Sequence, residues 1–356
     1  MIDVRQVILG KIIKIAGMIL GCLFAIVVVF FGYITIVEYN PKPIEEVEFR
    51  SGSKEISVGD SLSVLTFNIG YGAYDQDEDF FMDGGEKVRP DSKKDIENNM
   101  TAIAGIINNQ NADITFLQEV DIDSHRSYNV NEQVFLNIST GLGNAFAYNY
   151  NAKFVPFPMP PIGKVMSGVA TYSDLQVNSA SRISLPVPYK WPVKTCNLKR
   201  CILEERIPVN GSDRELVLLN IHLEAYDSGE GKVAQTKALF EKIEEEYAQG
   251  NYVLVGGDFN QQLQSLNLPE VKFDDDWMPG TIDEEMLPAG YSFAIADNLP
   301  TCRSLARSYV SKEESQTYII DGFVVSDNIQ VKSVKVLDEE FMYSDHNPVR
   351  LEIRIK

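Results

Sequence analysis

The chain has 356 residues, a length that fits one large domain or two small ones. Hydrophobic residues make up 44% of it, which excludes an intrinsically disordered protein. The formal net charge of −19 disfavours tight, non-specific binding to nucleic acid, because both partners would be strongly negative.

The N-terminal region differs in composition from the rest of the chain. No charged residue occurs from Ile15 to Val37, a stretch of 23 residues. As a helix it would be roughly 35 Å long, enough to cross the hydrocarbon core of a bilayer. A cleaved signal peptide is the alternative, but its apolar region is usually shorter and ends in a small-residue cleavage site. We therefore predict an uncleaved transmembrane helix over residues 15–37, with the membrane as a partner.

Charges on either side of this stretch predict its orientation. The flanking charged residues are Arg5, Lys11 and Lys14 before it, and Glu38, Glu45, Glu46 and Glu48 after it. Basic flanks stay in the cytoplasm. We therefore expect a single-pass protein of the cell membrane, with residues 1–14 cytoplasmic and the C-terminal bulk extracytoplasmic.

The remainder of the chain has the pattern of one α/β domain. Residues 38–60 are polar, and we interpret them as a tether carrying one short strand. Residues 61–356 contain many apolar, β-branched segments bounded by turns, which are typical of strands. Helical spacing predicts helices over about 95–109 and 231–248. These patterns favour two packed sheets with helices outside.

Four cysteines do not decide the redox state of the outer region. Cys196 and Cys201 are close enough in sequence for a local disulfide in an oxidising compartment, and two unpaired thiols are equally compatible. No cluster of His and Cys residues indicates zinc.

Several expected strands end in polar residues of a narrow set of types. These residues are Asn68 in LTFN, Glu119 in FLQE, Asn220 and His222 in LLNIH, Asp258 and Asn260 in VGGDFN, Asp321 in YIID, and Asp345 and His346 in SDHNP. Strand ends that meet at one sheet edge can converge on one pocket. Carboxylates and amides without Cys suit a hard cation such as Mg²⁺.

Each motif alone is weak evidence, since GDFN occurs in ordinary turns and a lone His is most often structural. The combination is more informative, because two of the three histidines in the chain lie within these motifs. Hydrolysis of a phosphate ester needs an activated water, a cation near the developing charge, and hydrogen-bond donors around phosphorus. The motif set contains a group for each of these tasks.

The ordered series TFN, LQE, GVA, NIH, GDFN, IID and SDHNP resembles the endonuclease/exonuclease/phosphatase superfamily over roughly residues 60–356. Members of that superfamily include pancreatic-type deoxyribonucleases, apurinic-site endonucleases, inositol polyphosphate phosphatases and bacterial sphingomyelinases. The resemblance implies a four-layer α/β sandwich and metal-dependent hydrolysis of phosphoester bonds.

The resemblance also implies a metal site. Glu119 would be the main Mg²⁺ ligand, with Asn68 close to it. Asp345 would join the metal site or stabilise the neighbouring histidine. Mn²⁺ is the alternative metal.

Catalytic roles follow from the same resemblance. His346 would be the general base that activates water, and Asp321 would orient a catalytic histidine. His222 would stabilise the charged phosphate in the transition state. Asp258 would orient the water or assist the metal, and Asn260 would hydrogen-bond a phosphate oxygen.

Two further residues are candidates for binding the substrate. Arg126 lies shortly after Glu119 and can reach a phosphate, and Asn220 belongs to the NIH motif. The acidic and aromatic segment 70–90 forms either a wall of the site or a plain surface insertion. The aromatic, Pro-rich segment 148–164 either dips into a membrane interface, lines an apolar pocket, or packs as an irregular loop.

The expected function is therefore an Mg²⁺-dependent phosphodiesterase that acts outside the membrane. Its expected substrate is a lipid head group or another small phosphodiester, favoured over nucleic acid because of the acidic charge. A surface endonuclease on DNA or RNA with the same mechanism is the alternative. A catalytically silent, membrane-bound binding protein is the alternative of another class, and the complete motif set argues against it. No protein partner is predicted.

Overall fold

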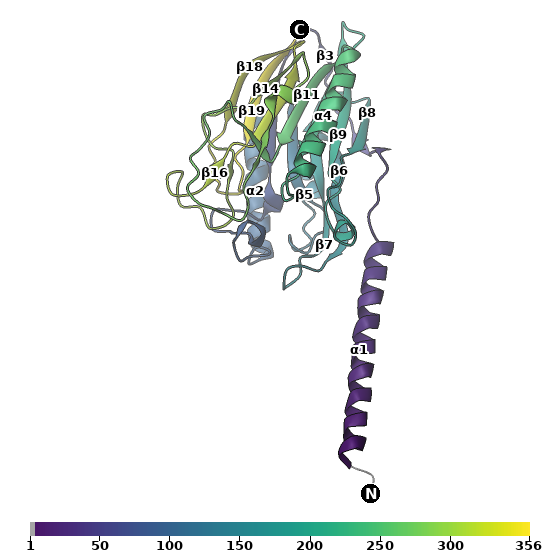
Figure 1. Cartoon of the computed structure of the whole chain (residues 1–356). Coiled ribbons are helices and arrows are strands. Elements are labelled where there is room, and N and C mark those ends of the chain that lie inside the picture. The colour runs from purple at the N-terminus through teal and green to yellow at the C-terminus, as the bar shows by residue number, and fades with distance from the viewer. Residues whose placement is uncertain (1–3) are drawn as a thin grey trace.

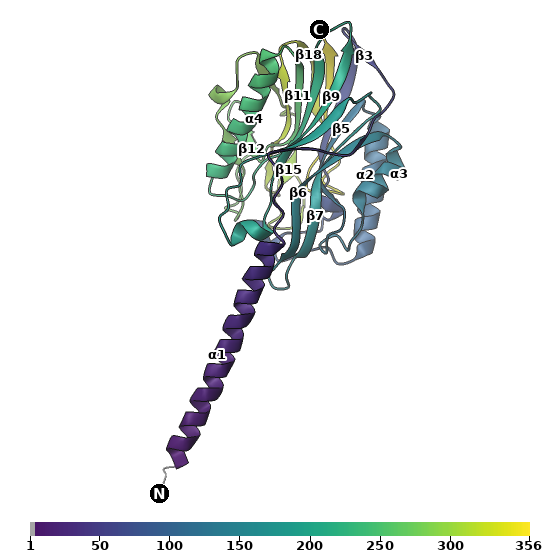
Figure 2. The same ribbon diagram turned by 90° about the vertical axis from the view of Figure 1, so that its right-hand side faces the viewer.

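A computed structural model describes residues 4–356 of the chain (Figures 1 and 2). A long helix, α1 (Val4–Ile36), projects from a body made of two packed β-sheets. The C-terminus lies at the end of the body remote from α1 in both views. Residues 1–3 of the expected cytoplasmic segment 1–14 lie outside the described residues.

Two mixed sheets form the body. The first has the order β1-β8-β9-β10-β11-β17-β14, with β3 paired to β9. Its strands are β1 (Ile44–Glu46), β3 (Ile56–Ser57), β8 (Ser179–Ser184), β9 (Cys201–Asn210), β10 (Glu215–His222), β11 (Tyr252–Asp258), β14 (Tyr291–Ala294) and β17 (Asp321–Ser326). The second has the order β18-β19-β4-β5-β7-β6-β2. Its strands are β2 (Phe49–Arg50), β4 (Ser61–Asn68), β5 (Ile114–Asp121), β6 (Gly143–Val155), β7 (Gly163–Ser173), β18 (Ile329–Val336) and β19 (Val349–Ile355).

Shorter elements complete the body. The two-stranded sheets pair β12 (Gln261–Leu263) with β13 (Gly280–Ile282) and β15 (Cys302–Arg303) with β16 (Thr317–Tyr318). The helices are α2 (Lys93–Gln110), α3 (Glu132–Thr140) and α4 (Glu230–Ala248), with the 3₁₀ turns η1 (Gly70–Gly72), η2 (Phe81–Asp83), η3 (Val193–Cys196) and η4 (Glu284–Met286).

The sequence of each layer explains how the layers pack. The strands of the two sheets carry apolar residues on both faces, because each sheet is covered twice. Val64, Phe116, Leu218 and Phe323 belong to the core between the sheets. In Figure 2, α4 lies outside one sheet, whereas α2 and α3 lie outside the other. The predicted four-layer α/β sandwich is confirmed.

Helix α2 illustrates how local sequence sets an element. Ser92 caps its N-terminus in a capping box with Asp95, so two free backbone N–H groups gain partners. Ile96, Met100 and Ile103 follow at helical spacing and are fully buried against the second sheet. The predicted helices over 95–109 and 231–248 agree with α2 and α4 within a few residues.

Helix α3 and strand β6 are among the elements that were not predicted from the sequence. Helix α3 is short, and β6 overlaps the segment 148–164, for which an irregular loop was one of the expected alternatives. β6 pairs with β7 over most of its length, and small buried residues such as Ala145 and Ala147 alternate with half-buried neighbours. That alternation lacks the β-branched residues typical of strands. The loop between the two strands is therefore reduced to residues 156–162.

The segment between α1 and the body is attached to both sheets. Three short strands, rather than one, occur in the expected tether: β1 pairs with β8, β2 with β6, and β3 with β9. Within α1, the 29-residue stretch Ile8–Ile36 is long and apolar enough to cross a membrane, a test that a signal sequence also passes. Cys196 and Cys201 are free thiols.

One buried carboxyl predicts a pH dependence of stability. Glu205 in β9 is 2% exposed, and its Oε2 lacks a hydrogen-bond partner. Burial raises the pKa of Glu205 from 4.5 to about 8, because the charged form is desolvated. The stabilising neutral form is therefore fully present below pH 4.5 and is lost as pH rises through the folded-state value.

We predict that the contribution of Glu205 to the free energy of unfolding falls by roughly 3 kcal/mol between pH 5 and pH 7.5. The Glu205→Gln variant should lose this component of the pH dependence in thermal unfolding of the detergent-solubilised chain. The Glu48→Gln variant, at an exposed position, should keep the wild-type profile. Parallel profiles for wild type and Glu205→Gln would contradict the prediction.

Candidate active site

Three site residues lie side by side on adjacent strands of the first sheet. His222 ends β10 and Asp258 ends β11, and the two are paired in register across these parallel strands. Asp321 begins β17 and is paired with Asp258 from the other side. The register of the sheet thus brings three motifs that are far apart in sequence to one edge.

The second sheet contributes residues to the same edge. Asn68 ends β4, and its Nδ2 donates to Glu119 Oε1 at 3.2 Å and to Asp258 Oδ2 at 3.1 Å. Its Oδ1 accepts a hydrogen bond from the N–H of Gly70 at 3.0 Å. The Asn68 amide therefore joins the ends of both sheets inside the site.

A local irregularity in β5 directs Glu119 to this edge. The pairing of β5 with β7 shifts between Leu117 and Val120, and Glu119 has a φ of 57°. A non-glycine residue in this left-handed region carries backbone strain, on the order of 1–2 kcal/mol. The irregularity turns Glu119 toward the cavity, while Gln118 points between the sheets and hydrogen-bonds Asn220.

Asp258 is the most connected side chain of the site. Besides Asn68, its Oδ1 accepts from the backbone N–H of Asn260 at 2.8 Å. His222 Nε2 lies 3.5 Å and His346 Nε2 lies 3.9 Å from Asp258 Oδ2. Burial and the neighbouring Asp321 raise the pKa of Asp258 to about 7.

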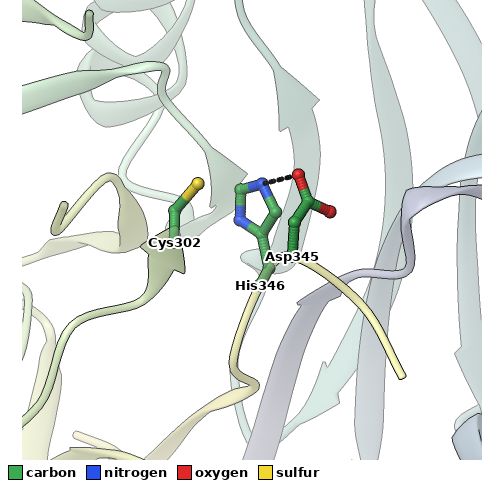
Figure 3. A group of neighbouring side chains, drawn as sticks. All are labelled: Cys302, Asp345 and His346. Atoms are coloured by element: carbon green, nitrogen blue, oxygen red, sulfur yellow. Dashed lines mark ion pairs between the residues drawn. The ribbon is translucent and has the colours of Figure 1, made fainter. Parts of the chain in front are cut away.

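His346 is paired with Asp321. Its Nδ1 lies 2.8 Å from Asp321 Oδ2, which fixes the ring and leaves Nε2 facing the cavity. Burial alone would lower the pKa of His346, but the carboxylates of Asp321 and Asp345 help to raise it well above its usual value. Figure 3 shows Asp345 beside the ring, with its Oδ2 at 3.9 Å from Nε2.

The second active-site histidine has the opposite character. Burial, together with the positive charges of Arg200 and His346, lowers the pKa of His222 well below its usual value. The ring is therefore neutral near pH 7. Its Nδ1 lacks a hydrogen-bond partner, so the ring of His222 is oriented mainly by its strand and by the contact of Nε2 with Asp258 Oδ2.

Cys302 is a site residue that was not predicted from the sequence. Its side chain lies on the opposite side of the His346 ring from Asp345 (Figure 3), and an isolated β-bridge joins it to His346. Burial raises the pKa of the Cys302 thiol to about 12, so the thiol stays protonated. Its sequence context, TCRS, matches no motif that would have revealed it.

The acidic groups of the site fit a hard cation. Burial raises the pKa of Asp345 to about 6, and Glu119 adds to this effect. Such buried, mutually repelling carboxylates gain most from a bound positive charge. Among the described residues, two groups of three candidate ligands occur, Asp258 with Asp321 and His346, and Cys302 with Asp345 and His346; within each group the ligand atoms lie within 4.8 Å of one another. A protonated thiol is a poor ligand, which leaves oxygen donors as the main set.

Arg126 also reaches the cavity. Its Nε and Nη2 bind Asp121 at 3.2 and 2.9 Å, and its guanidinium lies 3.7 Å from the ring centroid of Tyr71. Arg126 lines the same cavity as His222 and His346. Arg126 therefore stays a candidate for binding the substrate.

Asn220 lies elsewhere. It is fully buried, its Oδ1 accepts from Gln118 Nε2 at 2.9 Å, and its Nδ2 donates to the Ala170 carbonyl at 2.9 Å. It does not contribute to the cavity lining described for the site. The amide instead links the two sheets, so the geometry offers no contact with a substrate.

A cavity of about 570 Å³ is lined in part by the site residues, which include Glu119, Asp258 and His346. Asn260, Asp345 and the two active-site histidines lie at one end. The segment 70–90 supplies part of its wall, which is one of the two alternatives expected for it, and so do the end of β6 and the loop after it. The wall residues from these segments are Tyr74, Phe80, Phe81, Met82, Asp83, Val155, Pro156, Phe157 and Ile162.

Comparison with known proteins agrees with this geometry. Residues 65–346 match the Endonuclease/Exonuclease/phosphatase family. The chain belongs to this family. Its members are phosphoester hydrolases of the nuclease, phosphodiesterase and phosphatase types, and the chain is assigned to the same class. No curated protein sequence matches the chain significantly.

Solved structures are similar in fold. An endonuclease/exonuclease/phosphatase from Beutenbergia cavernae DSM 12333 has a TM-score of 0.55 at 16% identity, covering 83% of this chain and 72% of that one. A family protein from Bacteroides vulgatus has a TM-score of 0.52 at 16% identity, covering 83% and 100%. TDP2 from D. rerio, complexed with single strand DNA product, has a TM-score of 0.51 at 13% identity, covering 83% and 99%.

The placement of Asn220 predicts a stability role. Asn220→Ala leaves Gln118 and the Ala170 carbonyl without their buried partner, so the free energy of unfolding should fall by about 3 kcal/mol. Urea unfolding of the detergent-solubilised chain measures this loss. Asn108→Ala removes an exposed bond to the Ser139 carbonyl and should change stability by less than about 0.5 kcal/mol. An Asn220→Ala variant of normal stability with a raised KM would instead indicate substrate contact.

Proposed function

We propose that the protein is an Mg²⁺-dependent phosphodiesterase that cleaves a lipid head group or another small phosphodiester outside the cytoplasmic membrane. The observation that carries this proposal is the pairing of His346 with Asp321 at the edge where Asn68 joins Glu119 to Asp258. A base, an acidic site for a cation and a cavity thereby occur together.

His346 acts as the general base in this proposal. Asp321 holds Nδ1, so Nε2 takes the proton from the attacking water. Asp258, which lies 3.9 Å from that Nε2, orients the water. Asp321 and Asp345 help to raise the pKa of His346, which stabilises the imidazolium that forms when the ring takes the proton. A cation held by Glu119 and Asp345 would offset part of the Asp345 charge and so favour the unprotonated ring before the reaction.

His222 and Asn260 bind the phosphoryl oxygens in this proposal. A neutral imidazole has one N–H group. In His222 we place it on Nε2, from which it donates to the substrate, because Nδ1 has no hydrogen-bond partner. Asn260 donates one Nδ2 proton to the Leu223 carbonyl at 2.9 Å and keeps the other for the substrate. Arg126 adds positive charge to the same cavity.

Glu119, Asn68 and Asp345 would hold the Mg²⁺ ion, with Mn²⁺ as the alternative. Asn68 Oδ1 retains a lone pair beside the one used by Gly70. When bound, the cation offsets the negative charge that develops on the phosphoryl oxygens. The raised pKa values of Asp345 and Asp258, about 6 and about 7, support the need for a positive charge there.

Helix α1 and the charges that flank it support an extracytoplasmic location of the catalytic domain. The stretch Ile8–Ile36 meets the length and apolarity of a membrane span. Basic residues precede the uncharged part of this stretch and glutamates follow it, an arrangement that keeps the N-terminus cytoplasmic.

A surface endonuclease is the second candidate function. The D. rerio TDP2 structure holds a single strand DNA product, and that protein shares the fold. Against this candidate stands the net charge of −19, which weakens binding to a polyanion. Plasmid DNA and RNA incubated with the chain and Mg²⁺, with and without chelator, separate the two functions. A catalytically silent binding protein would hydrolyse neither substrate class.

The proposal predicts the effect of two substitutions. His346→Ala and Glu119→Gln should each lower turnover of bis-p-nitrophenyl phosphate by roughly 10²–10⁴-fold, because they remove the base and the main metal ligand. Chelation by EDTA should abolish wild-type turnover, and added Mg²⁺ should restore it. His125→Ala, at an exposed histidine outside the cavity, serves as control and should retain wild-type activity. Unchanged turnover in either site variant would refute the assigned roles.

A further inference from the structure

The catalytic cavity continues to the end of helix α1. Phe30, Phe31 and Ile34 of α1 line the same cavity as His222 and His346. Its lining is mainly aromatic and aliphatic beyond the catalytic end. The helix that is proposed to anchor the protein is therefore also a wall of the proposed active site.

Specific contacts hold this end of α1 against the body. The Phe30 and Phe154 rings pack edge to face with centroids 6.4 Å apart, and Phe31 packs on Trp191 at 5.6 Å. Trp191 Nε1 donates to Thr35 Oγ1 at 3.0 Å. Just beyond the helix, Glu38 pairs with the buried Lys199 at 3.0 Å. These contacts fix the wall rather than leaving α1 as a loose tether.

A run of aromatic rings forms the wall on another side. Successive centroids from Tyr71 through Tyr74, Phe80 and Phe81 to Phe157 are 4.9, 5.6, 4.7 and 5.6 Å apart. The run begins at the buried Tyr71, on which Arg126 stacks, and its other four rings line the cavity. It ends at Phe157, which is 64% exposed. An apolar path thus connects the catalytic end with the surface.

The surface end of this path lies at the level of the apolar part of α1. Phe30 precedes Ile36, the last residue of the candidate span, by six residues, which is about 9 Å along a helix. Exposed apolar side chains lie at this end of the cavity: Phe157 is part of its lining, and Trp191 packs on Phe31. Such residues insert to about this depth at the boundary between head groups and acyl chains. Figure 1 shows the end of α1 beside the lower edge of the body, and Figure 2 shows it at the same end of the body.

We infer that the substrate is a phospholipid of the bilayer in which α1 is embedded, an inference that rests on the proposed phosphodiesterase function. The phosphodiester lies at the catalytic residues, and the acyl chains lie between the aromatic run and the last turns of α1. The bases of a nucleic acid can stack on aromatic rings, but a nucleic acid has no long apolar chain to fill this cavity, and its polyanionic backbone is disfavoured by the net charge of −19. A small water-soluble diester would leave most of the cavity without a partner. The path along Phe157 and α1 lets the lipid enter from the membrane.

The reaction balances with water as the only co-reactant. The oxygen of water forms a bond to phosphorus and one ester P–O bond breaks. The proton taken from water is returned to the leaving oxygen. The products are one alcohol and one phosphomonoester.

The test uses the full chain reconstituted in vesicles with Mg²⁺. The vesicles contain phosphatidylcholine, phosphatidylethanolamine, phosphatidylglycerol and cardiolipin, all with oleoyl chains, and mass spectrometry follows their cleavage. Bis-p-nitrophenyl phosphate is measured in the same preparation. We expect cleavage of at least one lipid, and a rate for the dihexanoyl form of that lipid at least tenfold lower.

Substitutions test the wall itself. Phe31→Ala, and separately Phe157→Ser at an exposed position, should lower the ratio of lipid to bis-p-nitrophenyl phosphate turnover about tenfold, which is the loss expected from one aromatic contact. Phe24→Ala changes the same residue type in α1, at a position 71% exposed and outside the cavity, and should leave the ratio unchanged.

The outcomes separate the two proposals. Turnover of neither substrate class would overturn the phosphodiesterase function and this inference with it. Turnover of bis-p-nitrophenyl phosphate without cleavage of any of the four lipids would overturn this inference alone. Lipid cleavage with an unchanged ratio in both Phe31→Ala and Phe157→Ser would refute the cavity wall as the lipid-binding surface.

Discussion

The hydrogen bond from Asn68 Nδ2 to Asp258 Oδ2, 3.1 Å long, joins the two sheets at the edge where the site lies. The same amide group also binds Glu119, the acidic residue that a strained irregularity of β5 turns inward. The relative position of the two sheets therefore determines the distance between the metal-binding side and the histidine side of the site. Asn220 reinforces this arrangement deeper between the sheets, where it links Gln118 to the Ala170 carbonyl.

Charge is distributed unevenly across this edge. Asp321 stabilises a protonated His346, whereas burial and nearby positive charges keep His222 neutral. Two histidines with opposite pKa shifts can take different roles, one in proton transfer and one as a neutral donor. Buried Asp258 and Asp345, with pKa values of about 7 and about 6, are the groups that a cation would stabilise.

The sequence predicts the layers well, because continuous apolar strands and amphipathic helices directly reflect burial. It also predicts which strand ends converge, since polar residues after buried strands mark a sheet edge. It does not reveal Cys302, which reaches His346 through a bridge between distant segments. It also misplaces Asn220, because a strand-end amide has the same sequence signature whether it points to a cavity or between sheets. The contact of α1 with the cavity depends on tertiary packing around Trp191, which no periodicity predicts.

Anomalous diffraction from crystals of the full chain soaked in Mn²⁺ locates the cation without relying on activity. We expect one strong peak beside Glu119, on the side of Asn68 and Asp345, that disappears in Glu119→Gln. A peak between Cys302 and His346 instead, or a peak that persists in Glu119→Gln, would contradict the proposed metal site.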